Sequence, residues 1–95
     1  VHVVVAGKDE EMFSTAETLV TQLEKLGLSA ILDERKGVSV GVKFNDAELI
    51  GIPWIIVVGK KLQSGEVEIK NRRTSELMNI GIGDVEKIRD LIINA

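Results

Sequence analysis

Two apolar runs, at residues 1–6 and 54–58, constrain the fold of this chain more than any other feature of the sequence. Both are nearly continuous and rich in β-branched side chains, without the regular alternation that marks a strand with one wet face. They predict strands that are buried on both faces, as in a parallel sheet covered by helices. We expect the run at 54–58 to lie in the centre of the sheet.

Apolar residues at helical spacing predict three helices, over residues 9–26, over residues 40–50 and from residue 84 onward. Asp9 is a good N-cap for the first helix, and Gly27 supplies its C-terminal stop. Gly51 and Pro53 end the second helix. Residues 28–32 lie between the first two helices and predict a strand, so the chain is expected to begin with a β-α-β unit.

Residues 66–70 alternate polar and apolar side chains, which predicts a strand with one wet face. Residues 77–82 favour another strand, and the short polar turn between them predicts an antiparallel hairpin at one side of the sheet. The expected fold is a three-layer α/β/α sandwich, with a mixed, mostly parallel sheet of about five strands and three helices. We expect a single domain over residues 1–95.

The composition is that of an ordinary globular domain, with 44% apolar and 28% charged residues and no cysteine. The lack of cysteine excludes disulfides and thiolate metal sites, and it fits a cytoplasmic location. No apolar run has the length to span a bilayer, so no membrane partner is expected. The net charge of −3 argues against DNA as a partner. Residues 35–73, however, hold eight basic and four acidic side chains, which favours contact with a short stretch of RNA.

Motifs for catalysis and for phosphate binding are missing from the sequence. His2 is the only histidine, and it lies inside the first apolar run. Acidic residues at 9–11 occupy the junction where a nucleotide-binding loop would carry glycines, and they would repel a phosphate. We expect no catalytic residue, no metal site and no cofactor in this domain. A small-ligand domain is therefore the weakest of the functional hypotheses.

Charged side chains gather where the predicted strands end. Asp33, Glu34 and Arg35 follow the second strand, and they fit either a solvated loop or a surface that reads nucleobase edges. A carboxylate can accept hydrogen bonds from guanine N–H groups, and arginine can donate two to guanine O6 and N7. The candidates to hold phosphates are Lys60, Lys61, Lys70, Arg72 and Arg73. Aromatic residues are too few for a stacking platform, and Phe13, Phe44 and Trp54 are expected in the core.

The order of these motifs resembles a known family. Asp-Glu-Arg at 33–35, Gly-Val-Lys-Phe-Asn-Asp-Ala-Glu-Leu-Ile-Gly-Ile-Pro at 41–53 and Val-Glu-Ile-Lys at 67–70 are similar to the C-terminal anticodon-binding domain of class II aminoacyl-tRNA synthetases, and most similar to its prolyl branch. The resemblance covers almost the whole chain. It departs from the family at Glu34, where aspartate is usual, and at 36–40, which lack the usual Pro-Gly approach.

This resemblance implies a domain from the C-terminal end of a prolyl-tRNA synthetase, which reads the anticodon loop of proline tRNA and its two guanines. It implies anticodon contacts for Glu34, Arg35, Lys43, Glu48 and Lys60 or Lys61. Aminoacylation, with ATP, Mg²⁺ and proline, is then expected in a separate catalytic domain of a homodimeric, cytoplasmic ligase. The alternatives are the related anticodon domain of a threonyl, histidyl or glycyl enzyme, and an accessory protein–protein interaction module of the same fold.

Overall fold

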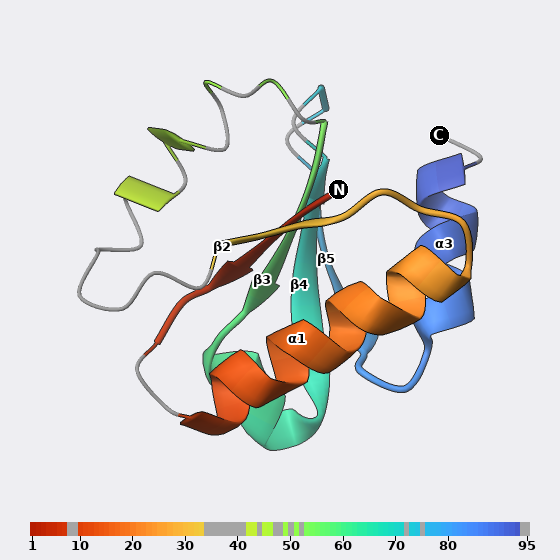
Figure 1. Cartoon of the computed structure of the whole chain (residues 1–95). Coiled ribbons are helices and arrows are strands. Elements are labelled where there is room, and N and C mark those ends of the chain that lie inside the picture. Colours follow the sequence, from red (N-terminus) through yellow and green to blue (C-terminus); the bar gives the residue numbers. More distant parts are fainter. Residues whose placement is uncertain are drawn as a thin grey trace.

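The computed structural model describes residues 1–7, 10–33, 42, 43, 45, 46, 49, 51, 53–71, 73, 74 and 76–93, apart from the side chain of Lys61 (Figure 1). Its helices are α1 (Glu10–Lys25), α3 (Val85–Ile93) and the 3-10 helix η1 (Lys60–Ser64). Its strands are β1 (His2–Val5), β2 (Ile31–Asp33), β3 (Trp54–Val58), β4 (Glu66–Asn71) and β5 (Glu76–Gly81).

The five strands form one mixed sheet in the order β2-β1-β3-β4-β5. β1 pairs in parallel with β2 and with β3, whereas β4 pairs antiparallel with β3 and with β5. The expected central position of residues 54–58 and the expected C-terminal hairpin are therefore confirmed. Because β2 and β3 flank β1 on opposite sides, the strand order reverses at β1, and open α/β sheets bind ligands at such a reversal.

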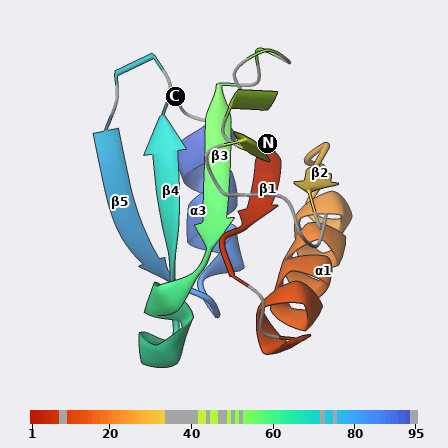
Figure 2. The same cartoon turned by 90° about the vertical axis from the view of Figure 1, so that its left-hand side faces the viewer.

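Helices α1 and α3 cover one face of the sheet, and the main core lies beneath them (Figure 2). Phe13, Leu19 and Leu23 of α1 pack there with Ile56 of β3 and Ile88 of α3. The opposite face of the sheet carries a smaller buried cluster of Val4, Ile55 and Val57. The described residues between 42 and 51 lie on that side, in front of β1 and β3 in Figure 2.

Local chemistry explains the two ends of α1. Glu10 and Glu11 place negative charge in the first turn, where it compensates the positive end of the helix dipole. At the other end, Gly27 adopts a φ of 90° and its N–H donates to Glu24 O. The N–H of Leu28 donates to Leu23 O, which completes a Schellman motif.

Some element boundaries differ from the sequence-based predictions. The predicted strand at 28–32 was placed too early, because Leu28 belongs to the helix cap and pairing with β1 begins at Ile31. The helical turn η1 was not predicted. The structure describes two α-helices instead of three, and the predicted helix at 40–50 falls largely outside the described residues. Those positions of it that are described adopt helical geometry, namely Val42, Lys43, Asn45, Asp46 and Leu49. The expected α/β fold is confirmed.

Candidate nucleic-acid interface

Three of the candidate residues lie near the edge where the parallel strands β2, β1 and β3 end. Asp33 is the last residue of β2, it is buried, and it pairs with Val4 of β1. Lys60 follows β3 after one residue, opens η1 and is exposed. Lys43 reaches the end of β1, where its Nζ donates a hydrogen bond to Val5 O at 2.9 Å. The strand directions bring these three residues to one edge, which we call the carboxyl rim.

Lys43 is the unusual member of this group, because only 2% of its surface is exposed. Lysine is almost never fully buried unless its ammonium is paired. Here the ammonium is held by Val5 O and lies 5.8 Å from the centre of the Phe13 ring. That distance falls within the range of a cation–π interaction. Lys43 therefore faces the interior and meets β1 and α1, while Lys60 faces solvent.

Several predicted site residues lie outside the part of the chain that the structure describes. Glu34, Arg35, Glu48 and Arg72 belong to this group. Lys61 lies in the backbone of η1, but its side chain is outside the description as well. The geometry of these candidates stays a prediction from the sequence.

The remaining two candidates, Lys70 and Arg73, do not join the carboxyl rim. Lys70 pairs with Ile55, near the amino end of β3, because β4 runs antiparallel to that strand. At the usual rise per strand residue, the three steps from Ile55 to the end of β3 span about 10 Å, and Lys60 lies two residues further along the chain. Arg73 is exposed in the following turn, where its N–H donates to Asn71 Oδ1 at 3.0 Å. The basic residues are thus divided between two edges of the sheet.

Polar side chains of β4 and β5 form a second candidate surface, which sequence reasoning found only in part. Alternation buries Val67 and Ile69 in the main core, so Lys70 and its neighbours at 66 and 68 project from the opposite face. The register adds two residues of β5 to that face, because Asn79 pairs with Glu68 and Leu77 pairs with Lys70. We call this surface the open face, with the members Glu66, Glu68, Lys70, Leu77 and Asn79.

On the open face, the carboxylate of Glu68, the amide of Asn79 and the ammonium of Lys70 come from neighbouring positions on the paired strands β4 and β5. Glu68 and Lys70 are half-buried, whereas Asn79 is exposed. Directly opposed residues in antiparallel strands have Cβ atoms only about 5 Å apart, so Glu68 and Asn79 can address one planar ligand together. The alternation that nominated Lys70 from the sequence applies equally to Glu68. Asn79 could be found only once the β4–β5 register was known.

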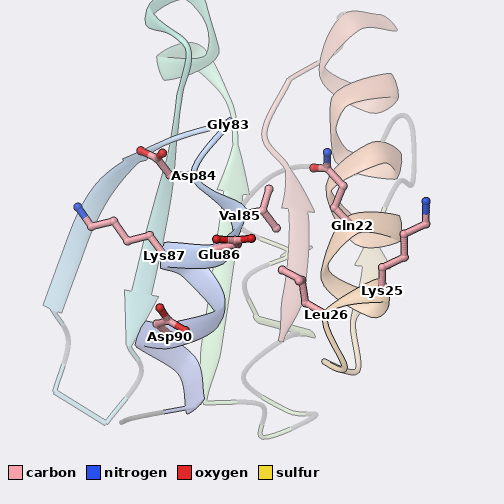
Figure 3. Close-up of a pocket in the computed structure, with 9 residues that line it drawn as sticks. All are labelled: Gln22, Lys25, Leu26, Gly83, Asp84, Val85, Glu86, Lys87 and Asp90. Atoms are coloured by element: carbon pink, nitrogen blue, oxygen red, sulfur yellow. The ribbon is translucent and has the colours of Figure 1, made fainter.

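A groove on the other side of the sheet has a different chemical character. It has a volume of about 640 Å³ and lies between the end of α1 and α3. In Figure 3, Asp84, Glu86 and Asp90 come from the α3 side, and Lys25 and Lys87 lie at opposite flanks of the groove. Its lining carries three carboxylates and two ammonium groups. None of the described candidate residues from the sequence lines this groove, so we place the candidate RNA surface on the opposite face.

The described residues contain no cluster of histidine, cysteine or acidic side chains with the arrangement of a metal site. Among the same residues, no helix has the length and apolarity needed to cross a membrane.

Known proteins resemble this chain in sequence over most or all of its length. The model of the anticodon binding domain family matches residues 1–90. A proline–tRNA ligase of Arthrobacter sp. (strain FB24) is 53% identical over 95 residues, which are 100% of this chain and 15% of that ligase. The proline–tRNA ligase of Paenarthrobacter aurescens (strain TC1) is 50% identical over 95 residues, with the same shares.

A solved structure has the same fold. The crystal structure of prolyl-tRNA synthetase from Cryptosporidium parvum, complexed with L-proline and AMP, matches with a TM-score of 0.86 and 23% identity. The match covers 98% of this chain and 20% of the synthetase chain. At this level of identity the likeness establishes the fold of the chain and nothing further.

These findings define the chain first as an α/β domain of the kind found in aminoacyl-tRNA synthetases. It belongs to the anticodon binding domain family, as the motifs at 33–35, 41–53 and 67–70 implied. The chain spans about 15% of the length of the two curated relatives named above, both of which are proline–tRNA ligases.

Proposed function

We propose that this chain reads the anticodon of proline tRNA as part of a prolyl-tRNA ligase. The observation that carries the proposal is the identity of about 50% to proline–tRNA ligases along all 95 residues. The open face supports it, because its side chains have the hydrogen-bonding character needed to distinguish nucleobases. Recognition by hydrogen bonds also suits a chain with only three aromatic residues, two of which, Phe13 and Trp54, are buried as expected.

The chemistry of guanine recognition assigns complementary roles to the open face and the carboxyl rim. Glu68 can accept hydrogen bonds from guanine N1–H and N2–H, and the amide of Asn79 can donate to O6 or accept from an amino group. Lys70, Arg73 and Lys60 are placed to hold phosphates as exposed or half-exposed cations. Glu34, Arg35, Glu48, Lys61 and Arg72 remain proposed contacts on sequence grounds.

The role of the domain in the whole ligase is to select the correct tRNA. Anticodon binding supplies free energy at a distance from the reaction, and catalysis takes place in another domain that binds ATP, Mg²⁺ and proline. Each good bidentate contact discriminates by about 1–3 kcal/mol, so contacts to two guanines supply about 2–6 kcal/mol of selectivity. We propose that the parent enzyme is a cytoplasmic homodimer and that this domain lies at its C-terminal end.

A titration with matched RNAs tests this proposal. The chain is titrated with the anticodon stem-loop of proline tRNA and with stem-loops in which either anticodon guanine is replaced by adenine. We expect each replacement to weaken binding about 5- to 150-fold, which corresponds to the loss of one bidentate contact. Equal affinity for all three stem-loops, measured at one fixed salt concentration, would contradict anticodon recognition.

A protein–protein interaction module of the same fold is the competing outcome. Replacement of Glu68 and Lys70 by alanine separates the two functions. Under the proposal, the double variant loses its preference for the native anticodon and keeps its folded circular dichroism spectrum. A variant that retains the full preference would remove the open face from the proposal.

A further inference from the structure

Lys43 is the buried cation of the carboxyl rim, and its position is unusual for a residue expected to contact RNA. Its Nζ donates to Val5 O across 38 positions of the sequence, and Phe13 lies within cation–π range. The described partners of its ammonium therefore come from β1 and from α1. A buried charge is retained in a fold only where good geometry offsets the cost of removing it from water.

The acceptor of this hydrogen bond lies at the point where the strand order reverses. The described pairing between β1 and β2 ends at Val4 and Asp33, but the pairing between β1 and β3 continues through Val5 and Val58. The N–H of Ala6 then donates to Val58 O at 2.8 Å, two residues before Lys60. The ammonium of Lys43 is therefore bonded to the end of β1, and the next residue of β1's chain is hydrogen-bonded to the end of β3, which Lys60 follows.

We propose that Lys43 is a positioning residue, whose buried ammonium fixes its own backbone, with that of its described neighbours Val42, Asn45 and Asp46, to the end of β1 and to α1 without contacting RNA. Figure 2 shows the described part of this segment in front of β1 and β3, on the side of the sheet away from α1 and α3. It therefore lies on the same side of the sheet as the open face. The link to RNA affinity rests on the function proposed above, whereas the attachment itself does not.

The mechanism follows from the geometry of the side chain. An ammonium donates along several directions at once, so it can hold the carbonyl of Val5 and still face an aromatic ring. A methionine of similar length fills the same space, but it donates no hydrogen bond and has no positive charge to interact with the quadrupole of the Phe13 ring. An arginine keeps the charge and its donors but presents them in a planar fork, so it restores the attachment only in part.

The first experiment measures the reactivity of lysine side chains in the intact chain. The chain is treated with a lysine-selective acylating reagent, with and without the anticodon stem-loop of proline tRNA, and modified peptides are quantified by mass spectrometry. We expect Lys43 to resist modification in both conditions, and Lys60 to react in the free chain and to be protected by RNA. Reaction of Lys43 at the rate of Lys60 in the free chain, or its protection only after RNA is added, would overturn the proposal.

The second experiment compares the variants Lys43→Met, Lys43→Arg and Lys60→Met by amide hydrogen exchange. Lys43→Met and Lys60→Met each remove one charge, so Lys60→Met is the matched control. We expect Lys43→Met to accelerate exchange at positions 42–46 about tenfold or more, Lys43→Arg to restore part of the protection, and Lys60→Met to change nothing there. Unchanged exchange in a folded Lys43→Met chain contradicts a positioning role.

Binding measurements connect the attachment to the proposed function. We expect Lys43→Met to weaken binding of the stem-loop, with partial rescue by Lys43→Arg, although Lys43 itself stays inaccessible. If the native chain shows no anticodon preference, the proposed function fails. The acylation and hydrogen-exchange results still test whether Lys43 holds its segment to β1 and α1. If Lys43→Met does not fold, Lys43→Arg and the acylation pattern of the native chain provide the test.

Discussion

Removal of single lysines from the two basic edges of the sheet tests where RNA lies on this domain. Lys60 marks the carboxyl rim, and Lys70 lies on the open face near the other edge. The part of β3 between them spans about 10 Å and Lys60 lies two residues beyond it, so their separation is at least the Debye length of about 8–10 Å at 0.1–0.15 M salt. If both cations contact phosphates, they do so as independent sites. The perturbations are Lys60→Met, Lys70→Met and the double variant.

The expected magnitude follows from the release of counterions by single-stranded nucleic acid. Each lost phosphate contact lowers the slope of log K against log salt by about 0.7. Between 50 and 200 mM salt, the difference in affinity between the native chain and either single variant therefore shrinks about 2.6-fold. The double variant loses a slope of about 1.4, because sites this far apart contribute additively to within about 0.5 kcal/mol.

Fluorescence anisotropy with a labelled anticodon stem-loop, recorded across that range of salt, measures these slopes. Lys87→Met is the matched control, since it removes one exposed lysine from the groove on the helix side of the sheet. We expect the control slope to equal the native one. If Lys70→Met leaves the slope unchanged while Lys60→Met lowers it, RNA is bound at the carboxyl rim alone. If Lys87→Met has the largest effect, the assignment of the RNA-facing side is wrong.

The remaining predictions concern base recognition, core packing and the helix cap. Glu68→Gln replaces one carboxylate oxygen on the open face with an NH2 donor and removes the charge, so the preference for the native anticodon should fall by about 1–3 kcal/mol with an unchanged salt slope in the same assay. Leu23→Ala leaves a cavity at a buried position of α1 and should lower the free energy of unfolding in urea by about 2–5 kcal/mol. Leu77 is 59% exposed, so Leu77→Ala should change that free energy by less than about 0.5 kcal/mol. Gly27→Ala should destabilise the chain by about 1–2 kcal/mol, because φ is 90° there while the space around a new Cβ is open. No loss of stability in Gly27→Ala would contradict the backbone explanation of the cap.

Local patterns were sufficient to predict most of the fold. The apolar runs at 1–6 and 54–58 correspond to β1 and β3, which are buried along their full length. The alternation at 66–70 correctly predicted β4 and its pairing with a following strand. Each of these patterns depends only on which faces of a strand meet solvent. A strand buried on both faces has a continuous apolar run, and a strand with one exposed face alternates apolar and polar residues.

The boundaries that were missed depend on contacts between distant residues or on very short elements. β2 begins at Ile31 because its register with β1 pairs that residue with His2, and the apolar residues just before it do not encode this partner. η1 spans only five residues, which is too short for a periodic pattern, and Gly65 with its φ of 74° follows it directly.

The candidate site was predictable as chemistry and less so as geometry. The sequence nominated Lys70 as a cation that holds a phosphate, and the resemblance implied an anticodon contact for Lys43. Neither source shows strand direction or long-range contacts. Lys43 is buried because its stem carries the ammonium to Val5 O, and no local pattern signals that contact. Lys70 lies toward the other edge because β4 runs antiparallel to β3.

The distribution of charge between the two faces of the sheet gives a physical reason for one direction of RNA approach. On the helix side, α1 carries Glu10, Glu11, Glu17 and Glu24 against Lys25. The chain at α3 adds Asp84, Glu86 and Asp90 against Lys87 and Arg89, and Arg89 forms a salt bridge with Asp90. A polyanion is repelled from this surface, and the repulsion reaches only about a Debye length. The open face and the turn after β4 carry Glu66 and Glu68 against Lys70 and Arg73, so the described charges there balance. The negative potential of the helix side is screened within about 8–10 Å at physiological salt. A chain with a net charge of −3 can thus present RNA with one receptive face at physiological salt. Lowering the salt should weaken the distinction between the faces, because the Debye length grows to about 30 Å at 0.01 M.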